Sequence, residues 1–169
     1  MRALALATLL CLAAPAAAAT AVAVSVEELA RGSAAVVRGK VTGARAHRSE
    51  DGRRIFTTYD VKVARVWRGV APRKVKVTVP GGTLGDLAQR VDAAPELAKG
   101  EEVVLFLERA GPGRFAIAGM AQGKFAVEAG RARPGLDHFV FVRTAVPEGE
   151  RRAEEMPLEE LERRVRSAR

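Results

Sequence analysis

Apolar and polar side chains alternate along the stretch from Ile55 to Gly69, which predicts the longest strand of the chain. Tyr59, Val61 and Val63 fall on odd positions, with polar residues between them. A period of two places one face of a strand in a core and the other in water. The alternation slips at Ala64-Arg65, because the next valine falls on the even set, and such a slip indicates a β-bulge. A long bulged strand favours a small coiled barrel over an open sheet.

Six further segments show strand patterns. Residues 101–108 are apolar on both faces, as in a strand that is covered on both sides. Residues 83–100 mix helical spacing with glycines, which predicts a long, partly ordered insertion, and residues 131–135 are expected to form a loop. The further strands are predicted at 34–46, 74–79, 101–108, 114–118, 124–128 and 139–142. The expected core comprises Val37, Val41, Tyr59, Val61, Val63, Val75, Val77, Leu105 and Phe115.

Two helices are predicted at the ends of the barrel domain. Ser25 followed by Glu28 is a capping box, so a short helix should run to Arg31, before a glycine. A final helix should start at Pro157, with i,i+4 pairs Glu159/Arg163, Glu160/Arg164 and Glu162/Arg166 along it. Its apolar stripe holds only three residues, so we expect the barrel to fold without this helix. The stripe either docks on the barrel or meets a partner.

The first residues have the pattern of a secretory signal peptide. A basic start, an apolar run and several small residues after Pro15 predict a leader over 1–19, with cleavage between 17 and 21. An uncleaved anchor is the alternative. The rest divides into a barrel domain at 20–145, a charged linker at 146–156 and the helix at 157–169. We therefore expect an exported monomer, periplasmic or extracellular, with no transmembrane segment after cleavage.

Cysteine content and charge limit the chemistry of the exported chain. The only cysteine, Cys11, lies within the leader, so no disulfide, zinc–thiolate site or cysteine nucleophile is expected. The chain carries a net charge of +8, and losing the leader would leave about one charge less. A basic exported protein is attracted to polyanions such as acidic cell-surface polymers or anionic lipid. The alternative is that the arginines serve solubility only.

The order of these segments resembles a known barrel. Tyr59-x-Val61-x-Val63-x-x-Val66-Trp67-Arg68-Gly69, followed by an alternating valine strand and Gly100–Leu107, resembles the OB-type barrel of netrin-like and tissue-inhibitor-of-metalloproteinase-like domains. The segments Val79–Gly82 and Gly119–Phe125 are similar to those of certain exported bacterial proteins. The resemblance covers roughly 34–127 and implies an OB-like fold. The inhibitors chelate their target's zinc with an N-terminal cysteine, which the mature chain lacks, so that activity does not carry over.

No catalytic, metal or cofactor constellation emerges from the residue types. His47 and His138 lie far apart, whereas a zinc site needs three or four converging ligands. The segment Gly119–Lys124 is one residue shorter than a phosphate loop, and Phe125 stands where magnesium chemistry needs Ser or Thr. The serines lack the Gly-x-Ser-x-Gly context of a hydrolase nucleophile. We therefore expect no enzyme activity and no cofactor.

Basic residues are predicted to share the outer face of the first three long strands. OB barrels commonly bind ligands across their second and third strands. Lysines on strands also protect against edge pairing, which is the alternative explanation. The candidate ligand-binding residues are Arg38, Lys40, Lys62, Arg65, Arg68, Lys74 and Lys76, with Arg73 beside them at one end.

Two functions follow as hypotheses. The first is a module that binds a protein partner, through the final helix or the insertion at 83–100. The second is a module that binds an acidic polymer or anionic lipid at the cell envelope through the basic face, with no specific nucleic-acid recognition. A steep salt dependence of binding favours the second hypothesis, and a salt-tolerant apolar contact favours the first.

Overall fold

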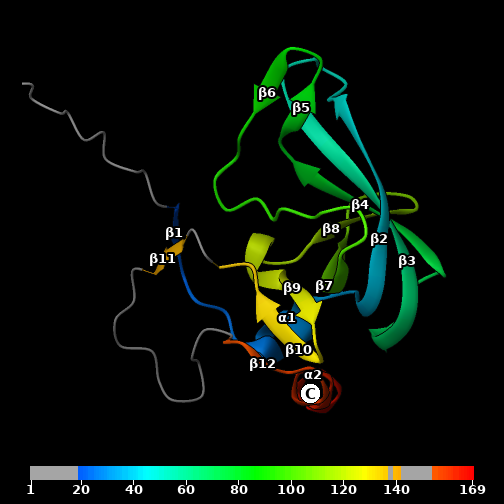
Figure 1. Ribbon diagram of the computed structural model, residues 1–169, viewed down its shortest axis with the longest axis vertical. Coiled ribbons are helices and arrows are strands. Elements are labelled where there is room, and N and C mark those ends of the chain that lie inside the picture. Colours follow the sequence, from blue (N-terminus) through cyan, green and yellow to red (C-terminus); the bar gives the residue numbers. More distant parts are fainter. Residues whose placement is uncertain (1–18, 137–138, 142–153) are drawn as a thin grey trace, which may run out of the picture.

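The computed structural model describes residues 19–136, 139–141 and 154–169 (Figure 1). The predicted leader, apart from its last residue, lies outside this range, as do His138 and most of the predicted linker. The helices are α1 (Val26–Gly32), the 3₁₀ turn η1 (Met120–Gly123) and α2 (Leu158–Ser167). The strands are β1 (Ala19–Ala21), β2 (Ala35–Arg48), β3 (Ile55–Gly69), β4 (Lys74–Pro80), β5 (Gly82–Leu84), β6 (Leu87–Gln89), β7 (Glu102–Arg109), β8 (Arg114–Ile117), β9 (Lys124–Glu128), β10 (Arg131–Pro134), β11 (Phe139–Phe141) and β12 (Met156–Pro157). Every predicted strand and helix is present within two residues of its expected ends.

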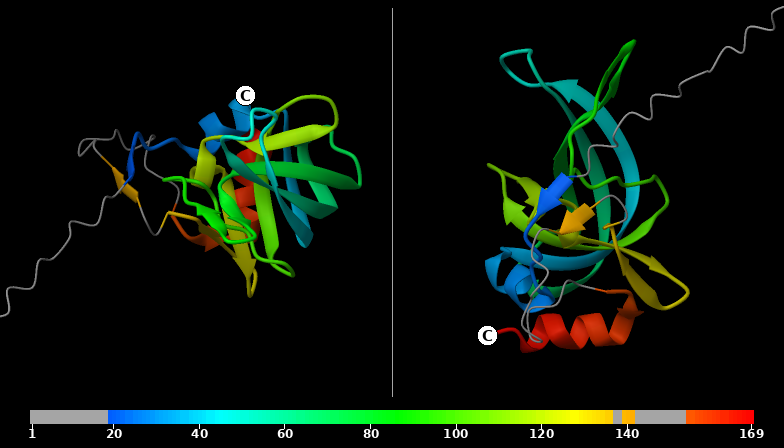
Figure 2. Two further views of the ribbon diagram at one scale, coloured as in Figure 1. Left: turned by 90° about the horizontal axis from the view of Figure 1, so that it is seen from above. Right: turned by 90° about the vertical axis from the view of Figure 1, so that its left-hand side faces the viewer.

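Five strands close into a barrel, which confirms the predicted fold class. Their order around the barrel is β2, β3, β4, β8 and β7, and β7 pairs with β2 to close the ring. All neighbours are antiparallel except β4 and β8, which run parallel. On the far side of β7, the sheet continues through β9, β10 and β12. Figure 2 shows α1 and α2 beside each other at one end of this barrel.

Strand β3 begins and ends where the alternation predicted, and it contains the predicted bulge. Arg38 pairs with Arg65 while Gly39 pairs with Val63, so Ala64 has no partner on β2. Gly39 is required at this point, because a Cβ there would lie 2.6 Å from the Lys62 carbonyl oxygen. The close approach of β2 and β3 lets the pair bend around the barrel.

Two apolar cores lie on opposite faces of β7. Val103, Leu105 and Leu107 point into the barrel, where all nine predicted core residues lie, although Tyr59 and Val63 are only half-buried. Val104 and Phe106 point the other way, into a second core beneath the two helices. The division explains why this strand is apolar on both faces. We call these the barrel core and the helix-side core.

Both helices are part of the helix-side core. Ser25 caps α1 through the predicted capping box: its hydroxyl accepts from the Glu28 N–H, and the Glu28 carboxylate accepts from the Ser25 N–H. On α2, the stripe Leu158, Leu161 and Val165 is buried against α1 and β3. The stripe is therefore docked on the barrel domain, as one of the two alternatives predicted. Because it is part of a core, we now expect the domain to lose stability without this helix.

The ion pairs of α2 differ from the expected i,i+4 set. Only the Glu162–Arg166 pair forms as predicted, at 2.8 Å. Arg163 instead contacts Glu160, which precedes it by three residues rather than four. The side chain of Arg164 reaches across to α1 and donates two hydrogen bonds to the carboxylate of Glu27, at 2.6 and 2.8 Å. Tertiary packing thus redirects the cation that local spacing had assigned to Glu160.

The Glu27–Arg164 pair should make stability depend on pH. Its hydrogen bonds hold the pKa of Glu27 below the ordinary value of 4.5. Because the folded pKa is depressed, the stabilisation is complete above the unfolded pKa and disappears as pH falls through the folded pKa. We expect Glu27→Gln to lower the free energy of unfolding at pH 7 by about 1 kcal/mol, since the pair is partly exposed and screened. Urea titrations at pH 7 and pH 3 measure this, and an equal loss at both pH values would contradict the prediction.

The insertion at 83–100 is more ordered than its composition indicated. It starts with the small β5–β6 hairpin and continues as an irregular segment across the barrel. Its Gln89 side chain accepts from the Ile55 N–H at 2.6 Å, and its Leu97 side chain is buried in the barrel core. Burial raises the pKa of Tyr59. The insertion is therefore held against one mouth of the barrel.

Residues 131–135 were wrongly predicted as a loop. Arg131 to Pro134 form β10, paired antiparallel with β9. The preceding Ala129 and Gly130 have φ of 49° and 75°, the left-handed pair that joins tight hairpins. Two arginines and a proline within four residues concealed a strand whose buried residues are Ala132 and Pro134.

Candidate functional site

The register of the barrel strands places three predicted lysines side by side. Lys40 on β2 pairs with Lys62 on β3, and Lys62 pairs with Lys74 on β4. Side chains directly opposite each other on neighbouring strands have Cβ atoms about 5 Å apart, so these three amines form a row across the barrel. All three lysines are exposed. Their neighbours Val41, Val61 and Val75 point into the barrel core, and this burial fixes the lysines outward.

A second row of charges runs beside the first. Lys76 on β4 pairs with Arg114 on β8, and both are exposed because their neighbours Val77 and Phe115 fill the barrel core. Asp60 on β3 pairs with Lys76 and is the acidic member of this row. We define the basic face as Lys40, Lys62, Lys74, Lys76 and Arg114. Within the described residues, none of the five cations forms an ion pair.

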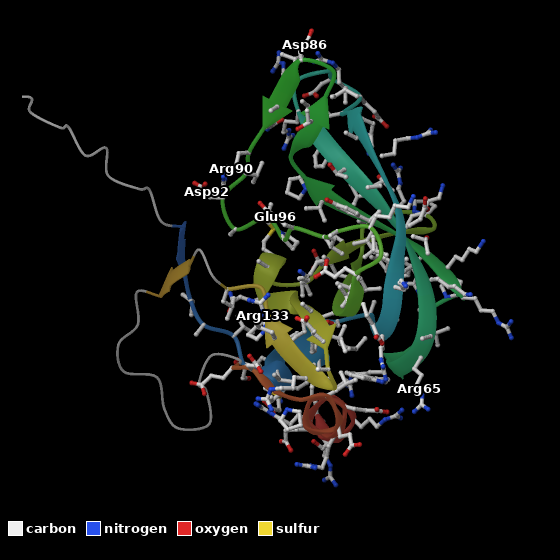
Figure 3. All side chains as sticks on the ribbon, in the orientation of Figure 1. Arg65, Asp86, Arg90, Asp92, Glu96 and Arg133 are labelled. Atoms are coloured by element: carbon white, nitrogen blue, oxygen red, sulfur yellow. The ribbon has the colours of Figure 1, made fainter. Side chains whose placement is uncertain are left out.

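Two predicted members have other partners. Arg38 contacts Glu102 on β7, with Nε and Oε1 2.6 Å apart. Arg68 donates to the carbonyl oxygen of Ala168 at 2.7 Å and so fixes the end of α2. Arg65 is exposed at the α2 end of β3 and points away from the barrel (Figure 3). Ligand binding by these three residues stays a prediction, but the charges of Arg38 and Arg68 already serve the fold.

Protection against edge pairing does not explain the basic face. Lysines guard strands whose backbone is open on one side. Lys62 lies on β3, which is paired with β2 and β4 on both sides at this level. Lys40 lies between β3 and β7, and Lys76 lies between β3 and β8. Lys40, Lys62 and Lys76 therefore stand on the closed wall of the barrel, whereas Lys74, the first residue of β4, has a strand partner among the described residues on β3 only. On the closed wall, like charges opposite each other oppose folding rather than assist it.

The other candidate groups found in the sequence have structural partners. The Nε2 atom of His47 lies 3.0 Å from the Thr58 hydroxyl, and its ring stacks on Phe56. The segment resembling a phosphate loop is the 3₁₀ turn η1. Its Gln122 amide group bonds backbone groups of Val22 and Val24 and so fixes the chain before α1. No group of metal-binding side chains occurs among the described residues.

The insertion carries charges of both signs at a distance from the basic face. Arg90, Asp92 and Glu96 lie along the irregular segment on the opposite side of the view from β3 (Figure 3). Glu101, at its end, accepts from the Ala98 N–H and contacts Lys124 on β9, with 2.6 Å between Oε1 and Nζ. The segment therefore carries charges of both signs, and Glu101 is already paired with Lys124, so these residues form no second basic patch.

Arg114 is the one residue of the basic face that sequence analysis missed. It precedes Phe115, which was assigned to the core, so strand alternation alone placed it on an outer face. Its position beside Lys76 depends on the parallel pairing of β4 and β8, which join residues almost forty positions apart. Strand order, which local periodicity does not encode, was the missing information.

Similarity to known proteins adds no function to this site. Within the described residues, no helix is both long enough and apolar enough to cross a lipid bilayer. No protein-family model matches the sequence, and no curated protein is significantly similar to it.

Proposed function

We propose that this chain is an exported, non-enzymatic module that binds an acidic polymer or an anionic lipid surface through the basic face. The observation that carries the proposal is the row Lys40–Lys62–Lys74, which crosses three paired strands with Lys76 and Arg114 beside it. Neighbouring Cβ atoms in the row lie about 5 Å apart. This spacing is shorter than the Debye length, about 8 Å at physiological ionic strength, so the potentials of the three lysines add.

A ligand with repeated anionic groups fits this row. Strands lie about 4.8 Å apart, so a chain of carboxylates, sulfates or phosphates lying across the strands meets one ammonium group per strand. Lysine is a compact point charge on a flexible stem, which suits charge recognition without a fixed geometry. The same ligand relieves the repulsion that the row imposes on the free protein.

The rival proposal, a protein partner held by α2 or by the insertion, has little exposed apolar surface to use. The stripe of α2 is buried in the helix-side core, and Leu97 of the insertion is buried in the barrel core. The exposed side chains of α2 are mainly polar, and the insertion exposes one large hydrophobic side chain, Leu87, which is 51% exposed. The geometry therefore favours the electrostatic alternative of the two functions derived from the sequence.

The proposal predicts that replacing Lys62, Lys74 and Lys76 together with Gln weakens binding to heparin strongly. Each lost contact with a dense polyanion lowers the slope of log K against log salt by about 0.7 to 0.9, so the slope should fall by about 2 to 3. Stability should hardly change, because exposed substitutions usually shift it by less than about 0.5 kcal/mol. Heparin affinity at several salt concentrations, and co-sedimentation with anionic vesicles, measure the two ligand sources separately.

The matched control replaces three exposed cations outside the basic face, namely Arg31, Arg90 and Lys99, with Gln. It lowers the net charge equally but leaves the row complete. If both triple variants elute from heparin at the same reduced salt concentration, net charge explains the binding and the basic face is not a site. Elution of the lysine variant at the wild-type salt concentration would refute the proposal as well.

A further inference from the structure

The outer half of β2 has a strand neighbour on one side only. β2 pairs with β3 along its whole length, but its pairing with β7 ends at Lys40. Beyond Val41, which still exchanges backbone bonds with residues 100 and 101, the β2–β3 hairpin rises above the barrel (Figure 2). No strand of the described residues pairs with the other side of Gly43–Arg48. This edge, Gly43–Arg48, is about 20 Å long at 3.3 Å per residue.

The bonding pattern shows which backbone groups face the open side. In an antiparallel pair, residues alternate between bonding their partner strand and facing away from it. The Ser49 N–H donates to the Arg54 carbonyl oxygen at 2.8 Å, so the residues at steps of two before Ser49 bond β3. Ala44, Ala46 and Arg48 therefore face away. The bonds of β3 lead to the same assignment. The Ile55 carbonyl oxygen accepts from the Gly81 N–H on the β4 side, so the residues at steps of two after Ile55 also face β4. These residues include Thr57 and Tyr59, the partners of Ala46 and Ala44.

The backbone groups of Ala44 and Ala46 are unengaged, and Ala44 is exposed whereas Ala46 is half-buried. No backbone or side-chain hydrogen bond of the described residues involves the N–H or carbonyl oxygen of Ala44 or Ala46, whereas the Arg48 carbonyl oxygen lies 3.1 Å from His47 Nδ1. The β5 strand lies against the inner face of the hairpin, since a Cβ on Gly82 would meet Thr57 Oγ1 and Ala46 Cβ. It covers a side-chain face and leaves the edge open.

The charge around the edge selects its occupant. Residues 40–48 contain Lys40, Arg45 and Arg48 and no acidic residue. The hairpin turn contains two acidic residues, the exposed Glu50 and Asp51, of which Asp51 is engaged by the Ser49 hydroxyl and the Arg53 N–H. A second copy of this chain would bring its own arginines against these arginines, and like charges on paired strands are destabilising. An acidic strand would instead pair its carboxylates with them.

We propose that the free edge of β2 at Gly43–Arg48 binds an extended, acidic segment of a partner protein by strand addition. The backbone groups of Ala44 and Ala46 supply the hydrogen bonds, and Arg45 and Arg48 supply the preference for acidic side chains. Strand addition is a recurrent mode of peptide recognition, in which the main chain gives affinity and side chains give selectivity. The inference uses a different surface from the basic face and does not depend on polyanion binding.

The test uses the full chain and a fluorescent peptide in which Glu and Val alternate over seven residues. The matched peptide has the same sequence with every backbone nitrogen methylated, so it keeps the charge but loses all hydrogen-bond donors. We expect the methylated peptide to bind at least tenfold more weakly in fluorescence anisotropy. Equal binding of the two peptides would overturn the proposal, because charge alone would then explain the contact. Absence of binding by the unmodified peptide at 1 mM (about −4 kcal/mol) would overturn it too.

Ala44→Pro tests the edge from the protein side. Proline removes the outward N–H of a residue that makes no bond to β3, and Gly43 before it has no Cβ to clash with the ring. Ala44→Thr keeps the N–H and is the control. We expect Ala44→Pro to weaken peptide binding at least tenfold, Ala44→Thr to bind within threefold of wild type, and both to retain the wild-type circular dichroism spectrum.

Amide NMR spectra locate the bound peptide whichever variant folds. The largest shifts should fall on the amides of Ala44, Ala46 and Arg48. Shifts centred on Lys62, Lys74 and Lys76 would place the peptide on the basic face and overturn the proposal. A dimer in light scattering that Ala44→Pro converts to a monomer would assign the edge to a second copy instead. Loss of heparin binding in the lysine variant with peptide binding retained would separate the two surfaces.

Discussion

Val61→Asp should prevent this chain from folding. Val61 is 1% exposed and lies in the middle of β3, with Val41 and Val75 opposite it on the neighbouring strands. An aspartate there buries a charge among valines with no cation in reach, or takes up a proton and remains an unsatisfied polar group. The expected loss is more than about 5 kcal/mol, comparable with the whole stability of a typical domain.

The control for that result is the adjacent position. Lys62→Asp introduces the same side chain one residue later, where strand alternation turns it into solvent. It should fold and melt within a few degrees of wild type. Circular dichroism and urea titration measure both variants. A Val61→Asp protein as stable as wild type would mean that the face of β3 assigned to the barrel core is the wrong one.

Removing residues 154–169 should destabilise the chain by at least about 4 kcal/mol. The deletion takes away three buried apolar side chains of α2, each worth about 1.5 to 3 kcal/mol. It also removes the Arg164 partner of Glu27 and uncovers Trp67, the only tryptophan. The indole N–H of Trp67 is buried without a partner among the described residues, so its surroundings are apolar. Its fluorescence should shift to longer wavelength in the truncated chain.

A point variant gives the same information without truncation. Leu161 is fully buried, and Leu161→Ala should cost about 2 to 5 kcal/mol, whereas Glu159→Ala on the exposed side of α2 should cost less than about 0.5 kcal/mol. A truncated chain with wild-type stability and unchanged tryptophan emission would show that the barrel core suffices. The original expectation from the narrow stripe would then hold.

Alternation predicted β3 and β4 because one face of each is buried, and an uninterrupted apolar run predicted β7, which is buried on both faces. The exact ends of β3 and the bulge at Ala64 followed from the positions of valines alone, and Ser25 with Glu28 sufficed for α1. Strand β10 could not be found this way. Its buried residues are a small alanine and a proline, which is a poor strand former, and its place depends on the hairpin with β9.

The sequence predicted which side chains point outward from the barrel, but not which of the outward cations are engaged by other residues. Alternation turned Lys62, Lys74 and Lys76 outward, and the structure has them exposed. The partner of Arg38 lies 64 residues away and that of Arg68 lies 100 residues away. Such pairings depend on strand order and helix docking, which are decided by packing between distant segments. For the same reason, the sequence did not predict the open edge of β2, which depends on where the pairing between β2 and β7 ends.

The two-sided burial of β7 has a consequence for how the molecule comes apart. Val103, Leu105 and Leu107 support the barrel, while Val104 and Phe106 support the helices, so one strand belongs to both packing units. Segments that share buried residues open together rather than separately. Barrel and helices should therefore behave as a single foldon, with no stable species in which one is intact and the other lost. Substitutions at these five positions should therefore destabilise both the barrel core and the helix-side core, and we expect the chain to tolerate substitutions least at these positions.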